Sequence, residues 1–211
     1  MLNKIKNKIK LYLKFYDIKQ INFENYDEYK AYFIEEDKIS NWDPSAFSKI
    51  IEENLDNKEN LHLVEIGVAR GATAKYTIDY LNKKILKYSG VDPYQPNYDR
   101  SDGFSYYNQK MMDNLYKFVN DKINDPRFNL IRKKSNKAYL DFEDNSIDAI
   151  YIDGDHTYRG VIKDIKYWAP KVKPGGLIVG DDYLTFSGVK KAVNQVFPNF
   201  NESGNTWFSI K

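Results

Sequence analysis

The chain has 211 residues, a net charge of +2 and no cysteine. This length predicts a protein with a core of its own, and 42% hydrophobic and 16% aromatic residues exclude a disordered chain. The absence of cysteine excludes disulfides, thiolate zinc sites and cysteine nucleophiles, so a metal site must use oxygen or imidazole ligands. The near balance of 32 basic and 30 acidic residues disfavours a dedicated duplex-DNA binder.

Residues 1–60 are polar and predicted to be helical, with a break at 41–44, where Asp43 before Pro44 predicts a helix start. Within the first 20 residues, apolar side chains recur at helical spacing among lysines. This pattern predicts a helix docked on its own domain or on a second subunit, which favours a homodimer. A helix on an anionic membrane surface is the second, disfavoured interpretation. We expect a cytoplasmic protein, because we find neither an export signal nor an apolar membrane-spanning stretch.

From residue 61, short apolar strands alternate with helices. Strands are predicted at 61–66, 88–92, 128–133, 147–153 and 177–181, and helices at 73–83, 106–120, 161–168 and 189–197. A turn is predicted at 174–176, and two short strands around 203–205. The alternation predicts an α/β fold, a mainly parallel sheet with helices on both faces. We assign residues 61–211 to a cofactor-binding domain and residues 1–60 to a helical extension that serves as a cap, in dimerisation or in acceptor selection.

Acidic residues gather where the predicted strands end, which is where ligands bind in such sheets. They are Glu65, Asp92, Asp153, Asp181 and Asp182. Gly67 and Gly71 form a tight turn after the first strand, but Ala69 replaces the middle glycine of the dinucleotide fingerprint. Asp92 is placed to accept hydrogen bonds from two ribose hydroxyls, or alternatively to cap the next segment. Glu65 has a structural alternative as an acceptor for backbone amides.

Asp153, Asp181 and Asp182 are predicted to converge, because neighbouring strands lie about 4.8 Å apart. Three converging carboxylates suit a hard divalent cation such as Mg²⁺. His156 lies in the loop after Asp153 and is a candidate general base, with a loop or helix-start histidine as the alternative. We interpret Asp155 as a turn or N-cap residue.

Four segments resemble the class I S-adenosylmethionine-dependent methyltransferases: VEIGVARGATA, SGVDPY, IDAIYIDGDHTYRGVIKDIKYWAPKVKPGGLIVGDDY and GVKKAV. Through IDGDH-x-Y and GDDY they resemble, more narrowly, the macrocin and mycinamicin sugar O-methyltransferase group, which is related to the catechol O-methyltransferases. The resemblance covers about residues 61–197. It implies a seven-stranded Rossmann-like sheet with an antiparallel last strand. It also implies S-adenosylmethionine and Mg²⁺ as cofactors, and methylation of a hydroxyl on a small molecule, most simply a sugar of polysaccharide or natural-product synthesis.

The resemblance also assigns roles to individual residues. The implied cofactor-binding residues are Glu65, Gly67, Gly71, Asp92, Ser135, Asn136 and Asp153. The implied metal ligands are Asp153, Asp181 and Asp182, and the implied catalytic residues are His156 and Asp153. The last ligand is usually Asn in the catechol enzymes, so Asp182 is a departure. We expect the loop 93–103 and the region of Trp42 to form walls of the acceptor site.

Other functions compete with this interpretation. The acceptor could be catechol-like, phosphorylated or a nucleic acid; Asp92-Pro93-Tyr94 is similar to the (D/N)PPY box of adenine methyltransferases but lacks its second proline. A nicotinamide-dependent oxidoreductase shares the predicted architecture, although the missing middle glycine speaks against it. A cofactor-binding partner subunit without catalysis is the last alternative, and the complete set of metal and base positions disfavours it.

Overall fold

The computed structural model describes residues 22–39, 43–98 and 102–211. The predicted amphipathic helix within residues 1–20 and Trp42 lie outside these ranges, so their expected roles stay predictions. Within the described ranges, every helix is too short or too polar to cross a membrane.

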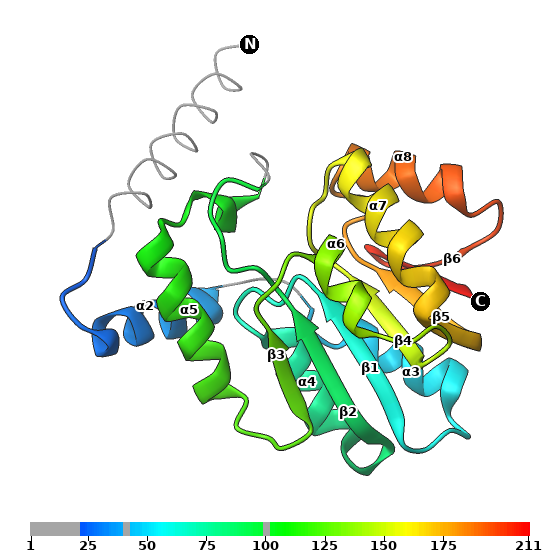
Figure 1. The fold of residues 1–211 in the computed structure, drawn as a ribbon, viewed down its shortest axis with the longest axis horizontal. Helices are drawn as coiled ribbons and strands as arrows, with labels where there is room; N and C mark the ends of the chain where they lie inside the picture. Colours follow the sequence, from blue (N-terminus) through cyan, green and yellow to red (C-terminus); the bar gives the residue numbers. More distant parts are fainter. Residues whose placement is uncertain (1–21, 40–42, 99–101) are drawn as a thin grey trace.

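A seven-stranded sheet forms the centre of the molecule, with the order β3-β2-β1-β4-β5-β7-β6 (Figure 1). The strands are β1 Leu61–Ile66, β2 Ile85–Val91, β3 Phe128–Ile131, β4 Ile147–Ile152, β5 Val172–Gly180, β6 Asn201–Ser203 and β7 Thr206–Ile210. The first five are parallel, whereas β7 pairs antiparallel with both β5 and β6. The predicted Rossmann-like sheet with an antiparallel last strand is therefore confirmed.

Helices cover both faces of the sheet. They are α2 Tyr26–Ile39, α3 Ala46–Leu55, α4 Ala72–Leu81, α5 Gln109–Lys122, α6 Ser135–Ala138, α7 Tyr158–Trp168 and α8 Ser187–Val196. Residues of α2, α3, α4 and α5 share one apolar core with the sheet, and residues of α6, α7 and α8 share the other. The helices α2 and α3 thus pack into the same core as helices and strands from residues 61–211.

The strand ends that carry the acidic residues lie at one edge because the central strands are in register. Ile66 at the end of β1 pairs with Val91 of β2 and with Ile152 of β4. The pairing continues one residue further, since Gly67 N donates to Val91 O and Asp153 N donates to Ile66 O. The strand order reverses between β1 and β4, and such switch points are where parallel α/β sheets bind ligands.

Two local predictions need correction, and one short helix is additional to those predicted. Pro174-Gly175-Gly176 lies inside β5, where Gly175 has φ of 72° and the pairing with β4 is irregular, so the expected turn is absorbed as a bulge. Helix α3 begins at Ala46, after a turn in which Asp43 Oδ1 accepts from Ser45 N at 2.9 Å. The short helix α6 was not predicted, because four residues give no periodic signal.

Candidate functional site

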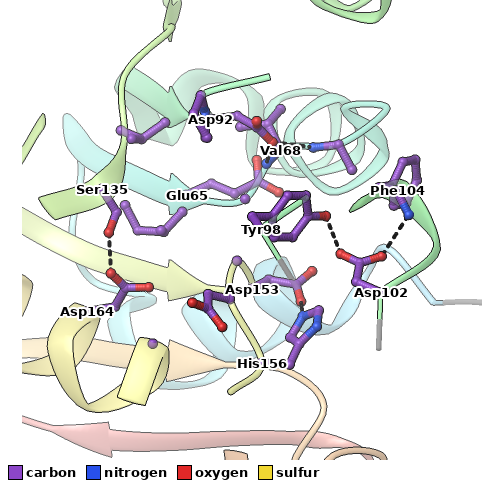
Figure 2. A pocket seen from close by; sticks show the side chains of 18 of the residues that line it. Glu65, Val68, Asp92, Tyr98, Asp102, Phe104, Ser135, Asp153, His156 and Asp164 are labelled. Carbon is purple, nitrogen blue, oxygen red and sulfur yellow. Dashed lines mark hydrogen bonds and ion pairs between the residues drawn. The ribbon is translucent and has the colours of Figure 1, made fainter. Parts of the chain in front are cut away.

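A cavity of about 610 Å³ opens at the carboxyl edge of the sheet (Figure 2). Most of the predicted site residues line it: Glu65, Gly67, Asp92, Ser135, Asn136, Asp153, His156, Asp181 and Asp182. Residues 93–98 and 102–103 of the loop expected to border the acceptor also line it, as does Asp43 beside the region of Trp42. Pockets for small molecules typically measure about 300–1,000 Å³, so the cavity has room for a cofactor and part of an acceptor.

The glycines of the first turn are required by the protein's own packing. Gly67 has φ of 87°, and a Cβ there would lie 2.0 Å from the carbonyl oxygen of Asp153. Gly71 has φ of 71°, and its Cβ would meet Ile123 and Val119 at 2.9 and 3.0 Å. Gly71 is the predicted cofactor residue that does not line the cavity. The predicted tight turn after β1 is confirmed. Atoms of the protein itself fill the space beside each glycine, so packing alone already requires glycine at both positions.

Asp92 holds the turn after β1 through backbone amides. Its Oδ2 accepts from Val68 N at 3.0 Å and Ala69 N at 3.1 Å, and its Oδ1 accepts from Tyr94 N at 2.7 Å. The capping role considered from the sequence is therefore observed. A carboxylate has about four acceptor positions, so Asp92 keeps capacity for about one further hydrogen bond, such as one from a ribose hydroxyl. Burial raises its pKa above the ordinary range.

Glu65 is buried at the end of β1. The Tyr88 hydroxyl donates to its Oε2 at 3.0 Å, so its observed partner is a side chain rather than the backbone amides expected for a structural role. Burial raises the pKa of Glu65 well above its usual range, against the hydrogen bond from Tyr88, which lowers it. A carboxyl group so placed on the cavity wall suits a cationic group such as the methionine amine of the cofactor.

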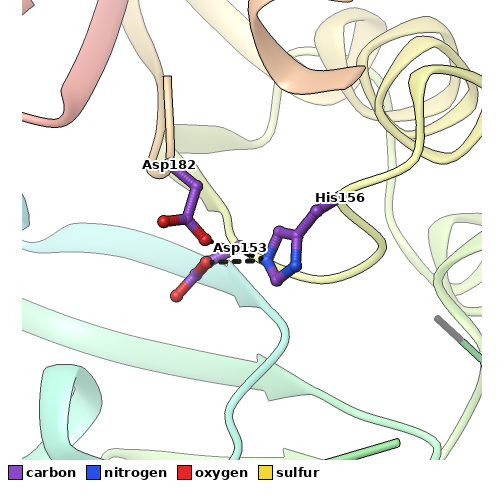
Figure 3. Close-up of side chains that lie close together, drawn as sticks. All are labelled: Asp153, His156 and Asp182. Carbon is purple, nitrogen blue, oxygen red and sulfur yellow. Dashed lines mark hydrogen bonds and ion pairs between the residues drawn. The ribbon is translucent and has the colours of Figure 1, made fainter. Parts of the chain in front are cut away.

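Asp153, His156 and Asp182 form a compact cluster on the cavity wall (Figure 3). Nε2 of His156 lies 3.4 Å from Asp153 Oδ1 and 3.3 Å from Asp182 Oδ2. One ligand atom from each side chain lies within 4.8 Å of the others. The imidazole also stacks on Phe186, with 4.5 Å between centroids and 12° between planes, which fixes the ring orientation.

The three groups of this cluster shift one another's pKa. Burial raises the pKa of Asp153 to about 7, although His156 lowers it by hydrogen bond and charge. Burial lowers the pKa of His156, but Asp153 and Asp182 outweigh burial and raise it to about 9. Burial raises the pKa of Asp182 as well. Two carboxylates that raise the pKa of a neighbouring imidazole stabilise positive charge, so a cation that replaced the proton on the imidazole would be stabilised as well.

Asp181 stands outside this cluster in the described structure. Its Oδ1 accepts from Asp182 N at 2.8 Å and from the Thr206 hydroxyl at 3.3 Å. The sequence predicted that three aspartates converge, but it did not show which of Asp181 and Asp182 lies closer to Asp153. The structure brings Asp182 to Asp153 and His156, and leaves Asp181 lining the cavity beside them.

Ser135 begins helix α6 and donates its hydroxyl to Asp164 of α7 (Figure 2). Asp164 is 5% exposed and lines the cavity with Ser135 and Asn136. The sequence analysis missed Asp164, although one signal was available. Its neighbours on the buried face of α7 are the apolar Val161, Ile165 and Trp168, so an acid on that face is unusual.

Two further cavity residues were missed individually, within the loop expected to form the acceptor wall. The Tyr98 hydroxyl donates to Asp102 Oδ2, and Asp102 Oδ1 accepts from Phe104 N at 2.9 Å (Figure 2). Only the loop as a whole carried a signal in the sequence. Asp155, by contrast, takes the turn role predicted for it, because its Oδ1 accepts from Thr157 N at 2.9 Å.

The cluster fits a hard divalent cation. Asp153 and Asp182 offer carboxylate oxygens on one wall, and Mg²⁺ is commonly held by one or two carboxylates plus water. The cavity fits a nucleoside cofactor as well, since it extends from the carboxyl of Glu65 to polar groups at Ser135 and Asn136. The fold and this site together define an α/β protein with a ligand-sized cavity at the carboxyl edge of a mainly parallel sheet.

Residues 64–183 match a family model described as a methyltransferase domain. The match spans more than half of the chain, and the protein belongs to this methyltransferase family. The family match agrees with the methyltransferase class that the resemblance implied and disfavours the nicotinamide-dependent alternative.

Two proteins are similar to this chain in sequence. A protein of Acanthamoeba polyphaga mimivirus is 32% identical over 154 residues, which are 68% of this chain and 64% of that protein. A protein of Sinorhizobium fredii is 38% identical over 53 residues, which are 25% of this chain and 6% of that protein. The chain thus spans less than two thirds of the length of either relative.

Solved structures share the fold at low sequence identity. A Staphylococcus aureus protein provisionally assigned as a caffeoyl-CoA O-methyltransferase has a TM-score of 0.61 and 17% identity, over 100% of both chains. The O-methyltransferase NovP has a TM-score of 0.57 and 17% identity, over 80% of this chain and 78% of that one. CalS11, a TDP-rhamnose 3'-O-methyltransferase of calicheamicin biosynthesis, has a TM-score of 0.53 and 12% identity, over 90% of this chain and 96% of that one.

Proposed function

We propose that the protein methylates a hydroxyl of a small molecule, most simply a sugar, with a divalent cation such as Mg²⁺ held by Asp153 and Asp182. The observation that carries the proposal is the position of the His156 imidazole, 3.4 and 3.3 Å from those two carboxylates on the cavity wall. S-adenosylmethionine would supply the activated methyl group, and the cation would supply positive charge beside the acceptor oxygen.

His156 is the proposed general base. It lies on the cavity wall, and the stacked ring of Phe186 holds its plane. Beside a cation held by Asp153 and Asp182, His156 would have a lower pKa again, and its Nε2 would be free of the proton. In this role Nε2 then accepts the proton that the acceptor hydroxyl loses, which typically contributes about 10²–10⁴-fold to the rate. The protein must then align the acceptor oxygen, the methyl carbon and the sulfur. This depends on positioning and needs no covalent bond to the protein.

The acceptor side of the cavity favours a ligand rich in hydroxyl groups. Tyr98 and Asp102 present a hydroxyl and a carboxylate there, and a carboxylate accepts hydrogen bonds from alcohols. A vicinal diol would bring two adjacent oxygens within reach of one cation. A sugar acceptor also agrees with CalS11, which acts on TDP-rhamnose and shares the fold. A catechol, a phosphorylated compound and a nucleic acid are the competing acceptors.

The test is a methyl-transfer assay with isotopically labelled S-adenosylmethionine. Nucleotide-linked sugars, free sugars, a catechol and RNA would be offered in parallel, each with Mg²⁺ and with EDTA. We expect label on a sugar, Mg²⁺-dependent and absent with EDTA. Transfer to RNA alone, or transfer that survives both EDTA and His156→Ala, would overturn the proposal.

A further inference from the structure

One carboxylate links the N-terminal extension to the turn after β1. Asp37, near the end of α2, places Oδ1 2.5 Å from Arg70 Nε and Oδ2 2.7 Å from Lys122 Nζ. Lys122 Nζ also donates to the Arg70 carbonyl at 3.1 Å. Asp37 therefore connects three segments that are distant in sequence: α2, the turn 67–71 and the end of α5.

Arg70 is the side chain through which this link reaches the turn. It is 4% exposed, and its guanidinium carbon lies 4.8 Å from the centroid of the Phe104 ring, which lines the cavity. A buried guanidinium is strongly destabilising unless anions offset its charge. Asp37 supplies such a charge at close range, so it helps to fix where Arg70 lies.

The backbone next to Arg70 adopts a conformation that needs support. Ala69 has φ of 46°, in the left-handed region that residues other than glycine adopt only where the surroundings hold them. Its carbonyl accepts from the Tyr94 hydroxyl at 3.1 Å, and its amide donates to Asp92. Ala69 lines the cavity, so the turn to which Arg70 belongs forms part of the cavity wall.

We propose that Asp37 is a positioning residue for S-adenosylmethionine binding: by fixing Arg70, it holds the turn 67–71 in the shape that receives the cofactor. The inference rests on the proposed function, in which S-adenosylmethionine binds in the cavity that Gly67, Val68 and Ala69 of this turn line. It gives the N-terminal extension a part in cofactor binding, whereas the sequence had suggested capping, dimerisation or acceptor selection.

The experiment compares Asp37→Asn with Glu35→Gln in the full chain. Glu35 lies on the same helix and its exposed carboxylate pairs with Lys38, so its variant removes the same charge without touching the turn. Isothermal titration with S-adenosylhomocysteine should show binding about 3- to 30-fold weaker for Asp37→Asn and unchanged for Glu35→Gln. Equal affinity of Asp37→Asn and wild type would overturn the inference.

Kinetics separate positioning from damage to the fold. With an active acceptor, Asp37→Asn should raise the KM for S-adenosylmethionine by a similar factor and change kcat by less than about twofold. Asp37→Glu, which keeps the charge, should recover part of the affinity. A fall in kcat with unchanged KM and unchanged affinity would mean that Asp37 only supports the fold, and would overturn the proposal.

Hydrogen exchange on the wild type gives an answer even if the Asp37 variants do not fold. Coupling between two sites is reciprocal, so S-adenosylhomocysteine should slow amide exchange in α2 around Asp37. Binding without any change in α2 would overturn the inference and leave the proposed function standing. Failure of the wild type to bind S-adenosylhomocysteine would instead overturn the cofactor site itself.

Discussion

Oδ2 of Asp182 lies 3.3 Å from Nε2 of His156 because the backbone turns sharply after β5. Asp182 has φ of 64°, a left-handed conformation that aspartate tolerates better than most residues. The turn directs Asp182 toward the loop after β4, while its neighbour Asp181 hydrogen bonds to Thr206 of β7. One backbone conformation thus decides which of two adjacent acids joins the cluster.

Removal of the proposed base should separate transfer from cofactor binding. We expect His156→Ala to reduce kcat by about 10²–10⁴-fold and to leave the Kd for S-adenosylhomocysteine within about twofold of wild type. His62→Gln is the matched control, because His62 contacts Ser89 from β1 and does not line the cavity. A His156→Ala enzyme as fast as His62→Gln would rule out the base.

The two adjacent aspartates should differ in metal dependence. After removal of metal with EDTA, activity would be titrated with MgCl₂. Asp182→Ala, which removes the ligand oxygens, should raise the Mg²⁺ concentration for half-maximal activity by about 10-fold or more. Asp181→Ala should raise it less, because Asp181 lies outside the cluster. An equal or larger effect of Asp181→Ala would contradict the arrangement.

Asp164 should make the protein less stable as the pH rises. Burial raises its pKa to about 7 from the ordinary 3.8, against the hydrogen bond from Ser135. Between these values the folded state binds the proton more tightly than the unfolded chain, so the free energy of unfolding falls as the pH rises through this window. The stabilisation by protonated Asp164 is complete below about pH 3.8 and is lost above about pH 7.

Asp164→Asn removes this dependence. From pH 4 to pH 8, its free energy of unfolding relative to wild type should rise by up to about 4 kcal/mol, since one pKa unit corresponds to about 1.4 kcal/mol. Urea unfolding at both pH values measures the change. Asp79→Asn, at an exposed carboxylate of α4, serves as the control. A parallel response of both variants would show that Asp164 is not responsible.

The close approach of β1 and β4 should make Gly67 intolerant of any side chain. Gly67→Ala would place Cβ 2.0 Å from the Asp153 carbonyl oxygen, and we expect the loss of about 3 kcal/mol or more in the free energy of unfolding. Gly204→Ala has a similar φ of 63° but open space, so it should cost only about 1–2 kcal/mol. Thermal unfolding of both variants tests the difference, and equal costs would show that backbone conformation alone matters at Gly67.

Apolar runs and glycine turns predicted most of the elements, because strands buried on both faces have few polar residues. The run at 147–153 is β4 within one residue, and the alternation of strands and helices predicted the parallel sheet. Local sequence could not predict α6, because four residues give no periodic signal. It could not predict the bulge at Gly175 either, since that depends on pairing with β4. The match to the methyltransferase family confirmed the class that the strand-end motifs indicated.

The sequence by itself determined the chemistry that is available: hard oxygen ligands and one histidine at the carboxyl ends of parallel strands, with no thiol. Only the tertiary structure decided which of these groups meet. It brought His156 to Asp153 and Asp182, paired Ser135 with Asp164, and connected Asp37 to Arg70. The physical reason is that a motif fixes residue types and spacing along the chain, whereas contacts between segments depend on strand register, on backbone conformation and on how the helices pack against the sheet.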